Sequence, residues 1–152
     1  MKSYTILFIV LAMAAGLWSC QKDPVAKIPQ ISMKGFSTDS VKAGNGSFVI
    51  LFFISDGDGD IDVDKKNTAG VYAKDLRFDT LGFVFYPFPE TMRASMKATD
   101  ISGTCYVDMP GVTMRADSVH LYRDTAKYEI YVKDLAGNES NHIFTPNLFI
   151  YR

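Results

Sequence analysis

Five aspartates alternate with other residues in one short stretch, and this pattern offers the clearest chemistry in the sequence. Carboxylates so close together repel one another unless they are solvated, protonated or neutralised by a cation. Hard divalent cations, above all calcium, take about six to eight oxygen ligands from such loops, and glycines let the backbone turn tightly enough for oxygens to converge. The sequence therefore predicts a candidate Ca²⁺ site within this ladder, which comprises Asp56, Asp58, Asp60, Asp62 and Asp64, with Gly57 and Gly59 between the first three.

Calcium binding is one of two interpretations of this stretch, with Asp56, Asp58, Asp60 and Asp62 as its ligands. The other is turn and surface chemistry, in which Asp side chains hydrogen bond their own backbone or face water. The pattern is not an EF-hand. Counting from Asp56, the sixth residue is Ile61 where Gly is required, and the twelfth is Asn67 where a bidentate Glu is required.

The sequence shows little that could catalyse a reaction. Cys105 alternates with Ile101 and Val107 on one strand face, which favours a buried, inert thiol. A nucleophilic cysteine would need a histidine base, and the chain has only His120 and His142. No Gly-x-Ser-x-Gly, His-Glu-x-x-His or phosphate-binding glycine loop is present. We therefore predict no catalytic residue and no enzyme activity, with a hydrolase of unrecognised type as the remaining alternative.

Several tyrosines stand at strand positions and have two interpretations. Aromatic rings offer flat apolar area with a polar tip, which suits the binding of sugars. Sheet packing is the more frequent role for tyrosine in strands, and we favour it. The tyrosines concerned are Tyr106, Tyr122, Tyr128, Tyr131 and Tyr151.

The first residues have the pattern of an export signal. Lys2 precedes an apolar run that reaches Leu17, and Ser19-Cys20 follow. The run is shorter than the roughly 20 residues that a spanning helix needs, and a basic flank with a small residue before the cut is typical of a secretory signal. The segment resembles a bacterial lipoprotein signal, in which Leu17 begins the lipobox and Cys20 becomes the first mature residue. The alternatives are an uncleaved single-span membrane anchor and a buried core helix.

This resemblance implies a signal peptide at 1–19, a lipidated tether at 20–29 and a folded domain at 30–152, with lipid on Cys20. Each buried methylene contributes about 0.8 kcal/mol, so two or more acyl chains hold a protein stably on a membrane. Gln21-Lys22-Asp23 resemble the start of the surface-export tag of Bacteroidetes lipoproteins, which Pro24 interrupts. We expect an outer-membrane lipoprotein of the cell envelope, and its periplasmic or surface-exposed orientation stays open.

Composition narrows the choice of partners. The chain has 152 residues, 16 basic and 17 acidic side chains, and a formal net charge of −1. This balance lacks the basic footprint of a nucleic-acid-binding protein, so we predict no nucleic-acid partner.

The part after Cys20 is predicted to be all-β. Its segments are rich in Val, Ile, Phe, Tyr and Thr and are bounded by turn residues, and about seven short strands of this kind indicate an antiparallel β-sandwich. Ser47–Ser55 contains an unbroken apolar run between its two serines, which favours a central strand covered on both sides or one whose outer face meets another surface. The predicted strands span 30–36, 47–55, 76–78, 82–86, 104–108, 118–121, 128–133 and 143–151, the last interrupted at Pro146.

The segment Tyr131–Asn141 contains Asp-Leu-Ala-Gly-Asn followed by Ser-Asn. It resembles the final hairpin of bacterial immunoglobulin-like and fibronectin-III-like domains, and the layout with Ser55–Ile61 is similar to small Ig-like lipoproteins of Bacteroidetes. The resemblance implies an Ig-like β-sandwich but no particular activity, since such folds host many functions.

Strand parity then relates two loops. If 47–55 is the second strand and 128–133 the sixth, the loops after both emerge at one end of the sandwich. Asp134, Asn138 and Asn141 would then lie near the aspartates. Asp134 and Asn138 are weaker candidates for the same metal site, because their pattern favours a turn role.

Two functional hypotheses follow. The first is a membrane-anchored, non-catalytic lipoprotein that acts as a surface interaction or accessory module, with an envelope protein complex as its candidate partner. The alternative is a calcium-assisted glycan- or peptide-binding lipoprotein that uses the acidic end of the sandwich.

Overall fold

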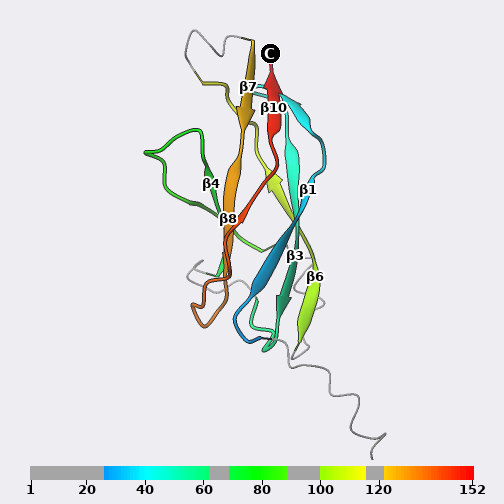
Figure 1. Ribbon diagram of the computed structural model, residues 1–152, viewed down its shortest axis with the longest axis vertical. Helices are drawn as coiled ribbons and strands as arrows, with labels where there is room; N and C mark the ends of the chain where they lie inside the picture. Colours follow the sequence, from blue (N-terminus) through cyan, green and yellow to red (C-terminus); the bar gives the residue numbers. More distant parts are fainter. Residues whose placement is uncertain (1–25, 62–68, 89–99, 116–121) are drawn as a thin grey trace, which may run out of the picture.

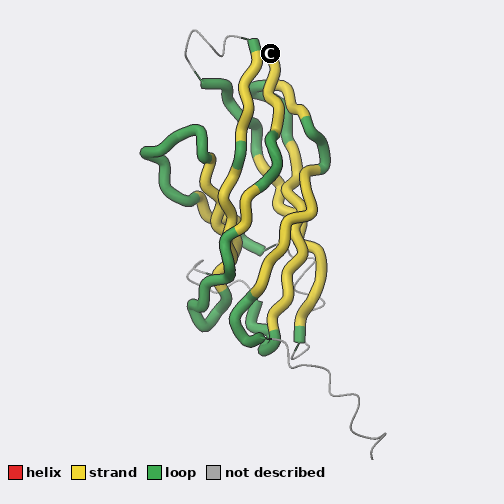
Figure 2. The backbone as a smooth tube through the Cα atoms, in the orientation of Figure 1, coloured by secondary structure: helices red, strands yellow, loops and turns green. Residues whose placement is uncertain are grey.

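The computed structural model describes residues 26–61, 69–88, 100–115 and 122–152. These residues form strands and loops and contain no helix (Figure 2). Among them, no helical segment has the length and apolar character needed to cross a membrane. The all-β prediction is confirmed, and the strands are β1 (Gln30–Phe36), β2 (Ser40–Lys42), β3 (Phe48–Asp56), β4 (Gly70–Asp75), β5 (Val84–Tyr86), β6 (Ile101–Met109), β7 (Arg123–Ala126), β8 (Tyr128–Lys133), β9 (Ile143–Phe144) and β10 (Leu148–Tyr151).

The strands pair into three sheets, with orders β1-β3-β6, β2-β10-β7 and β5-β4-β8-β9. Neighbours are antiparallel except β2 and β10, which are parallel. Lys127 alone separates β7 from β8, so these strands run nearly in line (Figure 1). The second and third sheets therefore continue one another and form the layer that faces β1-β3-β6.

The core lies between these two layers. Alternate residues of β3, from Phe48 to Asp56, are buried, as are Tyr128, Ile130 and Val132 of β8. This is the period of two that a strand with one core-facing side must show. The other side of β3, with Leu51 and Phe53, is only half-buried. Burial on both sides was therefore the wrong alternative for this apolar segment. Contact of its outer face with another surface stays a prediction.

Some predicted strands differ from those observed. The segment 76–78 is a turn instead, in which Phe78 N–H donates to the Asp75 carbonyl at 3.3 Å and Arg77 N–H donates to the Asp75 carboxylate at 3.0 Å. The chain pairs earlier, over β4, although Gly, Ala and Lys give that segment weak strand propensity. The segment 118–121 lies outside the described residues. The predicted interruption at Pro146 is confirmed, since it separates β9 from β10.

A buried ion network closes the layers near β7. Asp124 accepts hydrogen bonds from Arg77 Nη1 at 2.9 Å and from Arg115 Nη2 at 2.7 Å, and Arg77 Nη2 also lies 2.6 Å from Asp75. The side chains of Arg77 and Asp124 are 4% and 0% exposed. Arg77 is thus an inward-facing charge in a segment that the sequence suggested to be a strand.

Candidate functional site

The loop after β3 folds back on itself and gathers three aspartates. Asp56 Oδ2 accepts a hydrogen bond from Asp60 N–H at 3.1 Å, and Gly59 between them has φ of 70°. That left-handed conformation is one that glycine adopts without strain. Asp56, Asp58 and Asp60 each offer a carboxylate oxygen, and the three oxygens lie within 4.8 Å of one another. The structure therefore brings together three of the four predicted metal ligands.

The three carboxylates differ in burial and so in electrostatics. Asp56 is 0% exposed, Asp60 is half-buried and Asp58 faces solvent. Burial raises the pKa of Asp56 to about 6, with added repulsion from Asp58 and Asp60. Burial also raises the pKa of Asp60, and the negative charge of Asp134 adds to this effect. The cluster thus concentrates negative charge where water is scarce.

Two carboxylate oxygens in this cluster lack a partner. Asp56 Oδ1 and Asp60 Oδ1 are buried and have no hydrogen-bond partner among the described residues. A buried polar atom without a partner costs about 1–3 kcal/mol, and more when it is charged. Turn chemistry explains the Oδ2 atom of each residue, but it leaves both Oδ1 atoms unexplained.

The loop after β8 meets the acidic loop at the same end of the sandwich (Figure 1). Leu135 N–H donates to the Asp60 carbonyl at 3.1 Å, and Ala136 N–H donates to Asp60 Oδ2 at 3.0 Å. The prediction that the loops after these two strands share one end is confirmed. The strand count behind this prediction was wrong, because the two strands are the third and the eighth rather than the second and the sixth. Their loops share one end because β8 continues β7 in line, without a reversal of direction between them.

Asp134 and Asn138 hold the turn that follows β8. Asp134 Oδ1 accepts the Asn138 N–H at 2.7 Å, and its Oδ2 accepts Asn138 Nδ2 at 2.8 Å. Their hydrogen bonds are those of the turn role that the sequence favoured, and metal ligation by either residue stays a prediction. Asn141 has a different contact, because its amide hydrogen bonds both main-chain groups of Ile31 on β1 at 2.9 Å.

Cys20, Asp62, Asp64 and His120 lie outside the described residues. The lipidation of Cys20 and the tether at 20–29 therefore stay predictions. Asp62 likewise stays a predicted metal ligand.

A row of aromatic rings crosses the outer side of the β5-β4-β8-β9 sheet. Phe85, Tyr72 and Tyr131 stand at paired positions of β5, β4 and β8, and His142 continues the row. Ring centroids lie 4.8 Å apart between Tyr72 and Tyr131, and also 4.8 Å apart between Tyr131 and His142, with interplanar angles of 2° and 14°. Phe83 packs edge-on against Tyr131 at 4.9 Å. We call these five residues the aromatic face.

Charged side chains border the aromatic face. His142 Nδ1 lies 2.7 Å from Glu129 Oε1, and Lys133 Nζ lies 2.9 Å from Glu139 Oε1. Sequence reasoning considered Tyr131 for sugar binding and favoured a packing role for Phe83 and Phe85, but it did not join these rings into one face, because they meet only through strand pairing. Of the other tyrosines considered, Tyr128 is buried in the core, while Tyr106, Tyr122 and Tyr151 are exposed.

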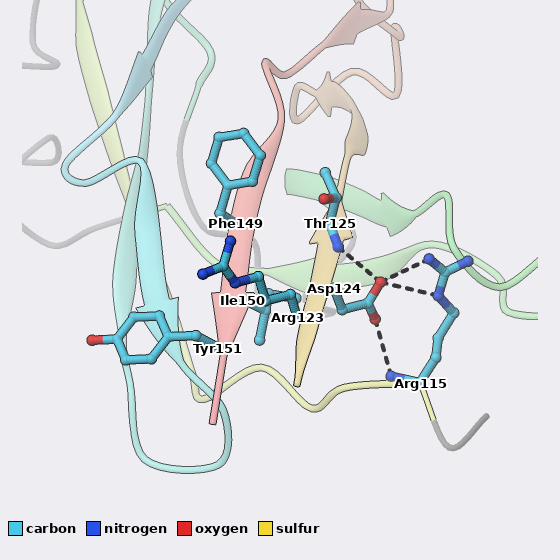
Figure 3. A pocket seen from close by; sticks show the side chains of 7 residues that line it. All are labelled: Arg115, Arg123, Asp124, Thr125, Phe149, Ile150 and Tyr151. Atoms are coloured by element: carbon cyan, nitrogen blue, oxygen red, sulfur yellow. Dashed lines mark hydrogen bonds and ion pairs between the residues drawn. The ribbon is translucent and has the colours of Figure 1, made fainter. Parts of the chain in front are cut away.

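A hollow of about 510 Å³ lies beside β7 and β10 (Figure 3). The Asp124 carboxylate on its wall is occupied by hydrogen bonds from Arg115 Nε, Arg115 Nη2 and the N–H groups of Arg115 and Thr125. An acid already paired in this way is no proton acceptor. The hollow is therefore a surface recess whose rim carries Arg123, Phe149 and Tyr151.

Cys105 is fully buried and unpaired, as the alternation on its strand predicts. Burial raises the pKa of its thiol to about 12. Because the thiolate is the reactive form, we expect the native protein to resist alkylation by iodoacetamide at pH 8 and the urea-unfolded protein to react fully. Mass spectrometry of the intact chain measures this difference. Equal labelling of native and unfolded protein would contradict the burial of Cys105.

Comparison with models of known protein families gives no match, and comparison with curated protein sequences gives none either. Among solved structures, the chain is similar to the SrpA adhesin R347E mutant from Streptococcus sanguinis, with 17% identity and a TM-score of 0.41. The match covers 86% of this chain and 58% of the adhesin chain. The chain therefore spans less than two thirds of the length of that adhesin chain.

Proposed function

We propose that this protein is a non-catalytic interaction module of the cell envelope, held to the membrane through lipid on Cys20, and that it binds a protein partner through the aromatic face. The observation that carries the proposal is the row Phe85, Tyr72, Tyr131 and His142 on the outside of the sheet. Aromatic residues are enriched in protein interfaces, and a gathered exposed patch of them marks an interaction site more often than isolated residues do.

The packing of the rings favours a protein over a glycan at this face. A sugar stacks on an open ring face, whereas Tyr131 has Tyr72 parallel to it on one side and His142 on the other. Tyr72 also has Phe85 against it at 5.5 Å. The flat surfaces are therefore already used, and ring edges and polar groups are what remain for a partner. The open ring faces that glycan binding would need belong instead to the exposed tyrosines outside the aromatic face, Tyr106, Tyr122 and Tyr151.

A photo-crosslinking amino acid at Phe83 tests the face in the native envelope. Phe83 is 36% exposed and lies in the loop before β5, so the change leaves the strands intact. We expect a discrete protein adduct that is absent when the same crosslinker replaces Tyr122, which is 73% exposed and lies outside the aromatic face. Identical adducts at both positions, or none at Phe83, would reject the face as the interaction site.

The anchor has its own test. We expect labelled palmitate to enter the protein and Cys20→Ser to abolish the label. If the wild-type protein stays unlabelled, the proposed lipid anchor on Cys20 is wrong.

A further inference from the structure

We propose that Asp56, Asp58 and Asp60 bind one calcium ion, which fixes the loop after β3 and, through the hydrogen bonds that Asp60 accepts from Leu135 and Ala136, stabilises the loop after β8 that packs against it. This goes beyond the proposed function, since binding through the aromatic face needs no cation. The two can also fail separately, because the aromatic face and the three aspartates share no residue.

The separation of the oxygens suits calcium. The three carboxylate oxygens lie within 4.8 Å of one another. Oxygens on opposite sides of a calcium ion are about 4.8 Å apart, because each bond measures about 2.3–2.6 Å. Magnesium needs bonds of about 2.0–2.1 Å in strict octahedral geometry and gives up its water reluctantly, so a loop that supplies three carboxylates favours calcium.

The unpartnered oxygens point independently to a ligand. Asp56 is completely buried, and its Oδ1 has no hydrogen-bond partner among the described residues, while its Oδ2 accepts Asp60 N–H. Asp60 has the same division, with Oδ2 taken by Ala136 N–H and Oδ1 left without a partner. The backbone therefore orients both carboxylates and leaves one oxygen of each for an ion to bind.

Asp134 contributes charge rather than a ligand in this proposal. Both of its carboxylate oxygens already accept hydrogen bonds from Asn138. Its negative charge nevertheless acts on Asp56 and Asp60. A divalent cation offsets the combined repulsion among these carboxylates. Protonation of one aspartate would neutralise the charge of that aspartate only.

The same loop connects the cluster to the start of the folded domain. Gly57 N–H donates to the Ala26 carbonyl at 2.8 Å, and the Asp60 carbonyl accepts Leu135 N–H at 3.1 Å. Along the sequence, Ala26 follows the predicted lipid site at Cys20 by six residues. Calcium binding would then stabilise the end of the domain that carries these loops and Ala26, which is the end that the predicted tether joins.

The test uses the mature protein, stripped with a chelator and titrated with calcium chloride alone by calorimetry. The titration extends to about 10 mM, which is about tenfold above the weakest affinities of extracellular calcium modules. We expect a single binding event, a higher Tm, and amide exchange at Leu135 and Ala136 slowed by at least about tenfold, since ion binding to the native state suppresses opening. Absence of binding heat and of any Tm change would overturn the proposal.

Three comparisons sharpen the result. Asp58→Asn changes an exposed ligand, so the variant should fold and lose at least about tenfold in calcium affinity, whereas Asp108→Asn, an exposed acid on β6, should bind like wild type. An Asp58→Asn variant that binds calcium as tightly as wild type would place the ion elsewhere and overturn the assignment. A magnesium titration that matches calcium in affinity and Tm shift would overturn the choice of calcium.

Discussion

Replacing Asp124 with asparagine should lower the free energy of unfolding by about 3–5 kcal/mol, the usual cost of breaking a buried ion pair from one side. The carboxylate is fully buried and faces two guanidinium groups, Arg77 at 2.9 Å and Arg115 at 2.7 Å. Asparagine has nearly the same shape but carries no charge, so the Arg77 guanidinium would keep only Asp75 as its ionic partner in this network. Domains of this size are stable by only about 5–15 kcal/mol, so the variant should be close to unfolding.

Urea denaturation, monitored by far-ultraviolet circular dichroism, measures this change in the free energy of unfolding. The matched control is Asp108→Asn, an exposed acid on β6, which should stay within about 0.5 kcal/mol of wild type. A loss below about 1 kcal/mol for the Asp124 variant would mean that the network contributes little beyond packing.

The same network predicts how stability depends on pH. Burial alone would raise the pKa of Asp124, but hydrogen bonds from Arg115, Thr125 and Arg77 outweigh it and hold the pKa well below its ordinary value of 3.8. A carboxyl whose pKa is lower in the folded state adds stability that is fully present above the pKa of the unfolded chain. That contribution declines as the pH falls below about 4. Asp124→Asn should therefore show a flatter loss of stability between about pH 4 and pH 2 than wild type.

Phe52→Ala should destabilise the domain by about 3–5 kcal/mol, the range for removing a large aromatic side chain from a core. Phe52 is completely buried at the centre of β3, where it faces the opposite layer. The cavity left by the ring cannot close, because β1 and β6 hold β3 on both edges. This expected loss rivals that of the ionic network and comes from a different cause.

Phe53→Ala is the matched control for Phe52. It removes the same ring from the next residue, whose side chain lies on the half-buried outer side with Lys34 Nζ 5.8 Å from the ring centroid. We expect a loss of about 1 kcal/mol, in proportion to the smaller area buried. Thermal or urea unfolding of both variants checks the difference, and equal losses would show that the two faces of β3 are equally important to packing.

The sequence by itself determined what depends on neighbouring residues. The alternation in Tyr128–Lys133 and the apolar content of Gln30–Phe36 predicted those strands with the bounds that the structure has. The spacing of Asp56, Asp58 and Asp60 around glycines predicted a loop in which carboxylates converge, because Gly59 provides the turn locally. The meeting of two distant loops was predicted as well, but from a strand count that the structure corrects, because β3 is the third strand and β8 continues β7 in line.

Only the tertiary structure decided which distant residues meet. The strand at Gly70–Asp75 has weak propensity of its own and forms because β5 and β8 pair with it on both sides. The aromatic face arises from the same pairing, and Arg77 turns inward because Asp124 lies there, far along the chain. The unpartnered oxygens of Asp56 and Asp60 have the same origin. Burial and hydrogen bonding are properties of the packed layers, and no local pattern of residues encodes them.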